Sequence, residues 1–166
     1  LPNLKTSFMQ KYSIDTSAIL DAWVRHYPHD IFPSFWNRFK SLAKSQVGIA
    51  TELIDHELGK KDDGCHKWFK ENNLSGFFVE LTDSVQNAVS DILKNPNYQR
   101  LIEDRKGAYG ADPFVIALAK VEDLIVVTGE NATNNLNKPK IPDVCKDMGI
   151  ECINILDLMR REGWQF

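Results

Sequence analysis

The chain has 166 residues, of which 43% are hydrophobic, and a formal net charge of −3 with a sequence pI of about 5.8. This length fits one domain with a hydrophobic core. The acidic balance argues against a protein that holds nucleic acid by bulk positive charge, although it allows a local basic rim. No apolar run approaches the roughly 18 residues that a membrane-spanning helix needs, so no membrane partner is expected.

Residues 1–8 lack the charged start and long apolar block of a signal peptide. Met9 directly precedes the first periodic segment. Residues 1–8 are therefore interpreted as a non-native or disordered extension, and residues 9–166 as a single domain. No C-x-x-C spacing connects the three cysteines, which are Cys65, Cys145 and Cys152. Their pattern indicates reduced thiols and a cytoplasmic protein.

The first predicted strand covers residues 11–15, and a helix is predicted to follow it directly. Asp15 therefore lies at the carboxyl end of a strand, the edge where ligands gather in open α/β sheets. Either Thr16 or Ser17 is expected to cap the helix. Helical spacing places four apolar residues on its buried face, namely Ile19, Leu20, Trp23 and Val24.

A second helix is predicted from Pro33 to Lys44, because proline is favoured in the first helical turn. Its apolar stripe contains Phe35, Trp36, Phe39 and Leu42. We interpret this stripe as core packing rather than as a partner interface. Surfaces on which nucleotide bases stack usually lie on exposed sheets or grooves, which a helical stripe does not provide.

A short apolar run over residues 47–50 predicts a buried strand, and Thr51 is expected to cap the helix after it. Glu57 is a carboxylate on the apolar face of that helix. It belongs to a functional site, or it occupies an edge position, or it forms a salt bridge, for which Lys60 and Lys61 are nearby. Glu52 is the weaker candidate, because the helix dipole alone favours an acid in the first turn.

The central part of the chain is predicted to be mainly helical. A turn is expected at Asp63-Gly64, and a minor strand at residues 77–81. Three helices are predicted around that strand, over residues 66–73, 82–93 and 98–105, and a loop over residues 106–110. The helix after the strand is expected to begin with Thr82 or Asp83 as its cap.

The clearest predicted strand covers residues 124–128, because it is uniformly apolar, as central parallel strands are. Glu130 follows this strand. Asp112 is predicted to be the N-cap of the helix before it, with Pro113 as the first helical residue. The chain then closes with a helix, a strand and a helix, predicted at residues 141–149, 151–153 and 155–161. This alternation predicts one parallel-sheet α/β domain.

Four carboxylates from distant parts of the sequence are predicted to meet at one edge of this sheet, because crossover connections bring the carboxyl ends of parallel strands together. They are Asp15, Glu57, Asp112 and Glu130. Clustered carboxylates repel one another unless a cation neutralises them. Mg²⁺ and Mn²⁺ prefer oxygen ligands, so one or two such ions are the expected cofactor. This chemistry suits phosphodiester cleavage, in which the ions activate water and neutralise phosphate charge.

The segment Ser13-Ile14-Asp15-Thr16-Ser17 resembles the opening motif of the PIN-domain ribonucleases. Three later segments are similar, in order, to the remaining acidic motifs of that family. They are the strand and helix around Glu57, the Ala-Asp-Pro helix start at Asp112, and the Val-Val-Thr-Gly-Glu segment at Glu130. The resemblance covers nearly the whole chain from Met9.

Residues 23–36 and 141–145 resemble more narrowly a PIN-like bacterial family, the domain of unknown function numbered 4411. The resemblance implies a three-layer α/β/α fold with a central parallel sheet. It also implies a Mg²⁺- or Mn²⁺-dependent endoribonuclease whose catalytic and metal-binding residues are Asp15, Glu57, Asp112 and Glu130. Many PIN-domain proteins are toxins of bacterial toxin–antitoxin pairs, which implies an RNA substrate, a small antitoxin and a homodimer. The wider family more often has Asp at the position of Glu130.

Three further polar residues are expected to support the site, namely Thr16, Thr128 and Asn131. Thr128 is predicted either to hydrogen-bond a metal-bound water or carboxylate, or to cap its strand. RNA contacts would have to come from a few cations, of which the candidates are Lys60, Lys61, Lys138 and Lys140. Ordinary solvated charges are the alternative interpretation of these lysines.

Two other functions remain open from the sequence. One is a non-catalytic PIN-like module that binds RNA or protein. The other is a metal-dependent phosphatase with Asp15 as nucleophile, which is disfavoured because that class needs a second Asp two residues later, where Ser17 stands. A receiver-like phosphoacceptor domain lacks its later Asp and Lys. The histidines and cysteines show no recognised zinc-binding spacing.

Overall fold

The computed structural model describes residues 9–103 and 110–166. Its centre is a five-stranded sheet in the order β3-β2-β1-β4-β5, in which all neighbouring strands are parallel. The strands are β1 (Tyr12–Ile14), β2 (Gly48–Thr51), β3 (Phe78–Val79), β4 (Ile125–Val127) and β5 (Cys152–Ile153). The predicted α/β class with a central parallel sheet is confirmed. The interpretation of residues 1–8 lies outside the described residues.

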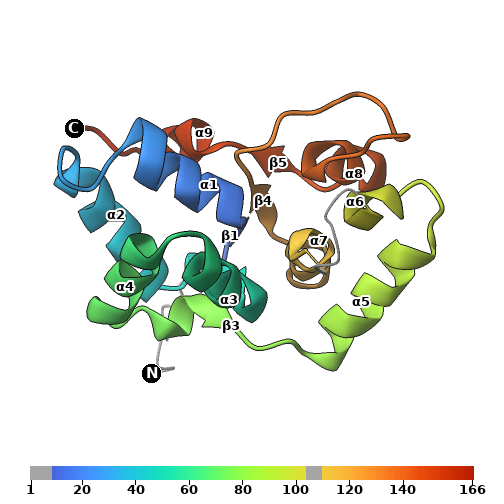
Figure 1. The fold of residues 1–166 in the computed structure, drawn as a ribbon, viewed down its shortest axis with the longest axis horizontal. Coiled ribbons are helices and arrows are strands. Elements are labelled where there is room, and N and C mark those ends of the chain that lie inside the picture. Colours follow the sequence, from blue (N-terminus) through green and yellow to red (C-terminus); the bar gives the residue numbers. More distant parts are fainter. Residues whose placement is uncertain (1–8, 104–109) are drawn as a thin grey trace, which may run out of the picture.

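Helices cover both faces of the sheet and complete three α/β/α layers (Figure 1). On one side lie α1 (Thr16–Asp21), the π-helical η1 (Ala22–His26), α2 (Pro33–Lys44), α4 (Asp63–Glu71) and α9 (Ile155–Arg161). On the other side lie α5 (Asp83–Lys94), α6 (Arg100–Glu103), α7 (Asp112–Glu122) and α8 (Ile141–Met148). Two more elements flank β3, namely α3 (Glu52–Lys61), which contacts α1 and α4, and the 3₁₀ turn η2 (Ser75–Phe77). Within the described ranges, no helix is long and apolar enough to cross a membrane.

The strand order reverses direction at β1. From β1 the chain first moves outward through β2 to β3, and then returns to add β4 and β5 on the other side of β1. The register pairs Ile14 with Val127. The residues that follow, Asp15 and Thr128, therefore leave the sheet together at its carboxyl edge. In open α/β sheets, ligands bind in the crevice at such a switch point.

The aromatic stripe of α2 is part of the core. Phe35, Trp36, Phe39 and Leu42 are all buried, which confirms the interpretation as core packing. The Trp36 ring packs edge-on against Trp68 of α4 with ring centroids 5.0 Å apart. Edge-to-face contacts of this kind are favourable for aromatic rings, so this contact stabilises the packing of α2 on α4 in addition to the burial of apolar surface.

The predicted buried face of the first helix is wrong at its end. Ile19 is buried and Trp23 is half-buried, but Val24 is 58% exposed. After Asp21 the helix changes from α to the wider π form of η1. The i→i+5 bonding of a π-helix rotates each following residue away from its expected α-helical position, and Val24 is therefore turned toward solvent.

Several predicted helix starts are also displaced. Asp15, not Thr16 or Ser17, occupies the N-cap position of α1, and its side chain makes no capping bond. The expected turn at Asp63-Gly64 is the first turn of α4, because the Asp62 carboxylate caps that helix through the N–H of Cys65 at 2.9 Å. Thr82 does cap α5 as predicted, by accepting the N–H of Val85 at 3.2 Å. The loop predicted at 106–110 lies mostly outside the described residues.

Candidate active site at the switch point of the sheet

Asp15 lies at the centre of the candidate site. It follows β1 directly, is only 3% exposed, and has extended backbone angles before α1 begins. Its N–H donates to the carbonyl oxygen of Val127 at 2.9 Å. This bond continues the β1–β4 pairing by one residue, so the backbone fixes the carboxylate at the switch point.

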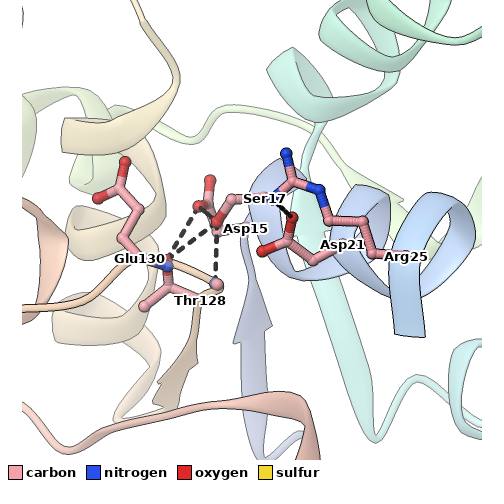
Figure 2. A network of polar contacts seen from close by, with 7 residues as sticks. Asp15, Ser17, Asp21, Arg25, Thr128 and Glu130 are labelled. Carbon is pink, nitrogen blue, oxygen red and sulfur yellow. Dashed lines mark hydrogen bonds and ion pairs between the residues drawn. The ribbon is translucent and has the colours of Figure 1, made fainter. Parts of the chain in front are cut away.

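Two hydroxyl groups hold the Asp15 carboxylate (Figure 2). Ser17 Oγ donates to Asp15 Oδ2 at 2.5 Å, and Thr128 Oγ1 donates to the same oxygen at 3.1 Å. In turn, Ser17 Oγ accepts the N–H of Gly129 at 2.9 Å, and Thr128 Oγ1 accepts the N–H of Glu130 at 3.1 Å. The loop after β4 is therefore connected to the start of α1 through side chains that surround Asp15.

The pKa of Asp15 is raised above its ordinary value. Burial is the main cause, because it disfavours the charged carboxylate. The negative charges of Glu130 and Glu57 raise the pKa further, whereas the hydrogen bonds from Ser17 and Thr128 lower it. The charges of Glu57 and Glu130 thus act on Asp15 from two other parts of the fold, and they destabilise its anionic form.

Glu57 joins three elements of the fold. Its Oε2 accepts a hydrogen bond from the Thr16 hydroxyl at 2.5 Å, and its Oε1 accepts one from the N–H of Ala111 at 3.1 Å. The carboxylate therefore lies between the first turn of α1 and the start of α7. Glu52 lies elsewhere, since its Oε1 accepts the N–H of Leu81 beyond β3 at 3.1 Å. Of these two acids, Glu57 is the one that approaches Asp15.

Asp112 is buried at the start of α7, with 4% of its surface exposed. The prediction that it is the N-cap is wrong, because Ala111 occupies the N-cap position and α7 begins at Asp112. Asp112 is therefore the first helical residue and Pro113 the second. Its neighbour Ala111 is the residue whose N–H contacts Glu57, so Asp112 begins α7 beside that carboxylate.

Glu130 lies in the loop after β4 and is half-buried. Its Oε2 accepts the N–H of Ile141, the first residue of α8, at 3.1 Å. Figure 2 shows its carboxylate projecting to the same side of Thr128 as that of Asp15. Asn131, which follows it, is exposed.

The sequence interpretation missed Asp143, which shapes the loop that carries Glu130 and Asn131. Burial alone would raise the pKa of Asp143, but the N–H of Lys140, the N–H and hydroxyl of Thr133 and the N–H of Asn134 outweigh it and hold that pKa below its usual range. These bonds are 2.8 to 3.0 Å long. The available signal was an acid at the third position of a helix with proline in its first turn, where its carboxylate accepts the N–H of the N-cap residue Lys140.

The four lysines considered for RNA contacts are exposed. Lys60 and Lys61 end α3, and Lys138 and Lys140 lie in the loop before α8. Their exposure fits both solvated charges and ligand contacts.

The donor set at the site fits a hard divalent cation in its chemistry. Carboxylate and hydroxyl oxygens converge on Asp15, and oxygen is the donor that Mg²⁺ and Mn²⁺ prefer. Over residues 9–103 and 110–166, however, no three His, Cys, Asp or Glu side chains are already grouped to hold a metal ion. Glu57 and Glu130 are each engaged with a backbone N–H. Joint coordination of an ion would therefore require these side chains to turn toward Asp15.

The fold and the site together define an α/β protein with interacting carboxylates at the switch point of a parallel sheet. The model of the domain of unknown function DUF4411 matches residues 12–166, so the chain belongs to the DUF4411 family. No curated protein matches the chain.

Proposed function

We propose that the protein is a divalent-metal-dependent endoribonuclease of the PIN-like type, which cleaves RNA phosphodiester bonds at the switch point. The observation that carries this proposal is that two other acids are bound to the immediate neighbours of the buried Asp15 carboxylate. Glu57 accepts the hydroxyl of Thr16, and the N–H of Glu130 donates to the Thr128 hydroxyl that contacts Asp15. A buried carboxylate among other carboxylates is destabilised as an anion unless a proton or a cation neutralises it. Of these two neutralising groups, only a divalent cation would also supply catalytic chemistry for phosphodiester cleavage.

In this proposal, Asp15, Glu57, Asp112 and Glu130 would hold one or two Mg²⁺ or Mn²⁺ ions. The bound ions supply activation of water and neutralisation of charge on the phosphate. Ser17 and Thr128 hold the Asp15 carboxylate by two hydrogen bonds to one oxygen, Oδ2, and would thereby orient it toward a bound ion. Thr16 and Ala111 keep Glu57 beside the site.

We further propose that the protein acts as the toxin of a bacterial toxin–antitoxin pair. This part rests on the resemblance to PIN-domain ribonucleases, from which an RNA substrate, a small antitoxin partner and a homodimer follow. Free thiols at Cys65, Cys145 and Cys152 agree with a reducing, cytoplasmic location, which is proposed with it.

A non-catalytic PIN-like binding module is the second candidate. The observation that favours it is that Glu57 and Glu130 already bond the backbone at the starts of α7 and α8. In that role, the acids would position helices rather than ions. A phosphatase with Asp15 as nucleophile is less favoured, because Ser17 stands where its second Asp is needed.

The wild-type protein is expected to cleave single-stranded RNA in the presence of Mn²⁺ or Mg²⁺, and this cleavage should stop when EDTA removes the ion. The measurement is gel analysis of end-labelled RNA, with p-nitrophenyl phosphate hydrolysis as a parallel assay for the phosphatase. RNA binding without cleavage in either metal, by protein with a native circular-dichroism spectrum, would favour the binding module instead.

A further inference from the structure

A pocket of ≈ 430 Å³ lies beside the acidic site, between the α1–η1 helix and the start of α9. We call it the α1–α9 pocket. Its volume is within the range of small-ligand sites. Its lining includes Asp21, Arg25, Gly129, Asn131, Asn154 and Leu156, whose contacts are described below.

The pocket and the acidic site share a wall. Gly129 lines the pocket, and its N–H donates to Ser17 Oγ, which in turn donates to Asp15 Oδ2. A side chain at position 129 would displace the Asp21 carboxylate, because a Cβ atom there would lie 2.3 Å from Asp21 Oδ2, and it would also lie only 3.0 Å from the carbonyl oxygen of Ser17. The glycine thus brings the loop after β4 against α1, and the pocket begins two hydrogen bonds from Asp15.

Arg25 gives the pocket a cation. Its guanidinium lies 3.3 Å from Asp21 Oδ1, and Figure 2 shows the side chain folded back along the helix toward Asp21. The Arg25 side chain is 72% exposed, so this ion pair is weak and its donors remain accessible to another anion. A guanidinium matches the two oxygens of a phosphate with paired hydrogen bonds.

The remaining walls combine apolar and amide groups. Leu156 is 46% exposed and contributes apolar surface. Asn131 and Asn154 line the pocket from two different elements. Asn154 Oδ1 accepts the N–H of Asp157 at 2.9 Å, which orients its amide plane. Apolar surface with amide groups at its edge is the combination that holds a flat, hydrogen-bonding nucleobase.

We infer that the α1–α9 pocket holds one nucleotide of a single-stranded RNA substrate next to the scissile phosphodiester, with its phosphate on Arg25 and its base against Leu156. This inference rests on the proposed function and extends it to the substrate strand. A single strand presents both unstacked bases and phosphates, so its base can bind the apolar and amide wall of the pocket while its phosphate binds Arg25. An acidic protein thereby gains local phosphate recognition without a broad basic surface.

The test measures binding of a fluorescein-labelled single-stranded RNA by fluorescence anisotropy, in EDTA so that the proposed cleavage cannot occur. Arg25→Ala is expected to raise the Kd about tenfold, because one charge-assisted contact is lost. The slope of log K against log salt should fall by about 0.7. Arg25→Lys should restore part of the affinity.

Arg160→Ala is the matched control. Arg160 also pairs with an aspartate on its own helix, Asp157, at 3.4 Å, and its side chain is 69% exposed. It does not line the pocket. The control is expected to bind RNA within about twofold of the wild-type Kd, because a non-contacting surface charge acts only through screened long-range attraction.

Equal losses in Arg25→Ala and Arg160→Ala would overturn the inference, because bulk charge would then explain both. Absence of wild-type RNA binding, or unchanged binding by Arg25→Ala, would overturn it as well. Parallel cleavage assays in Mn²⁺ separate this result from the proposed function. If the wild type cleaves RNA but Arg25→Ala binds normally, only the pocket is wrong. If Arg25→Ala loses binding but no protein cleaves RNA, only the catalysis is wrong.

Discussion

The Asp15→Asn variant is expected to lose Mn²⁺-dependent RNA cleavage by at least about 100-fold while keeping its fold, because a metal ion contributes several kcal/mol of transition-state stabilisation. Asparagine has nearly the same shape as aspartate, and its carbonyl oxygen still accepts hydrogen bonds from Ser17 and Thr128. The change therefore removes the charge that would hold the ion while it keeps the local packing. The rate is measured with labelled RNA, and folding with circular dichroism.

Glu52→Gln is the matched control for this variant. Glu52 is an exposed acid that contacts the N–H of Leu81 rather than Asp15. Its neutralisation changes the net charge of the protein by the same amount, and cleavage is expected to stay within about twofold, as is typical away from an active site. An Asp15→Asn protein that cleaves at the wild-type rate would show that Asp15 holds no catalytic ion.

The second large effect concerns stability against pH without metal. Unfolding returns the Asp15 carboxyl to its ordinary pKa of 3.8, whereas the folded state raises it. Between these two values the folded protein binds more protons than the unfolded chain, so the free energy of unfolding falls as pH rises. The contribution of Asp15 to stability is fully present below pH 3.8 and is lost as pH rises through the raised pKa. Above the raised pKa, where Asp15 is ionised, the buried charge is therefore a net cost to stability.

Without metal, Asp15→Asn is expected to leave stability unchanged or to increase it at pH values above the raised pKa, because it removes this charge. It should also flatten the pH dependence above pH 3.8, and added Mn²⁺ should stabilise the wild type more than the variant at the same ion concentration. Urea unfolding at several pH values measures these differences. A loss of more than about 2 kcal/mol in the variant would instead identify Asp15 as a structural hydrogen-bond acceptor.

The sequence predicts well those features that depend on local pattern. The uniformly apolar strand before Thr128 and the alternation of strands with helices led to the parallel sheet, and that sheet brings Asp15 and Glu130 to one edge. The stripe on α2 is likewise buried as its helical spacing predicts. In each case the feature can be predicted from residues that are close in sequence, because backbone periodicity decides which side chains face the core.

Features that depend on distant partners were not predictable in the same way. Ser17 contacts Thr128 and Gly129, which lie more than 100 residues further along the chain, so its role at Asp15 has no local signature. Ala111, the N-cap of α7, donates its N–H to Glu57, a residue 54 positions earlier in the chain, and the local sequence does not reveal that contact. The π-helical turn at η1 changes side-chain directions without any proline or glycine to mark it.

The central claim is that Asp15 and its neighbouring carboxylates hold a divalent ion, and calorimetric titration of Mn²⁺ into the metal-free protein tests it most directly. The wild type and Glu52→Gln should bind one or two ions with the same affinity. Asp15→Asn should bind at least about tenfold more weakly, since one charged ligand is removed. Absence of binding by the wild type, or equal affinity in Asp15→Asn, would contradict the claim.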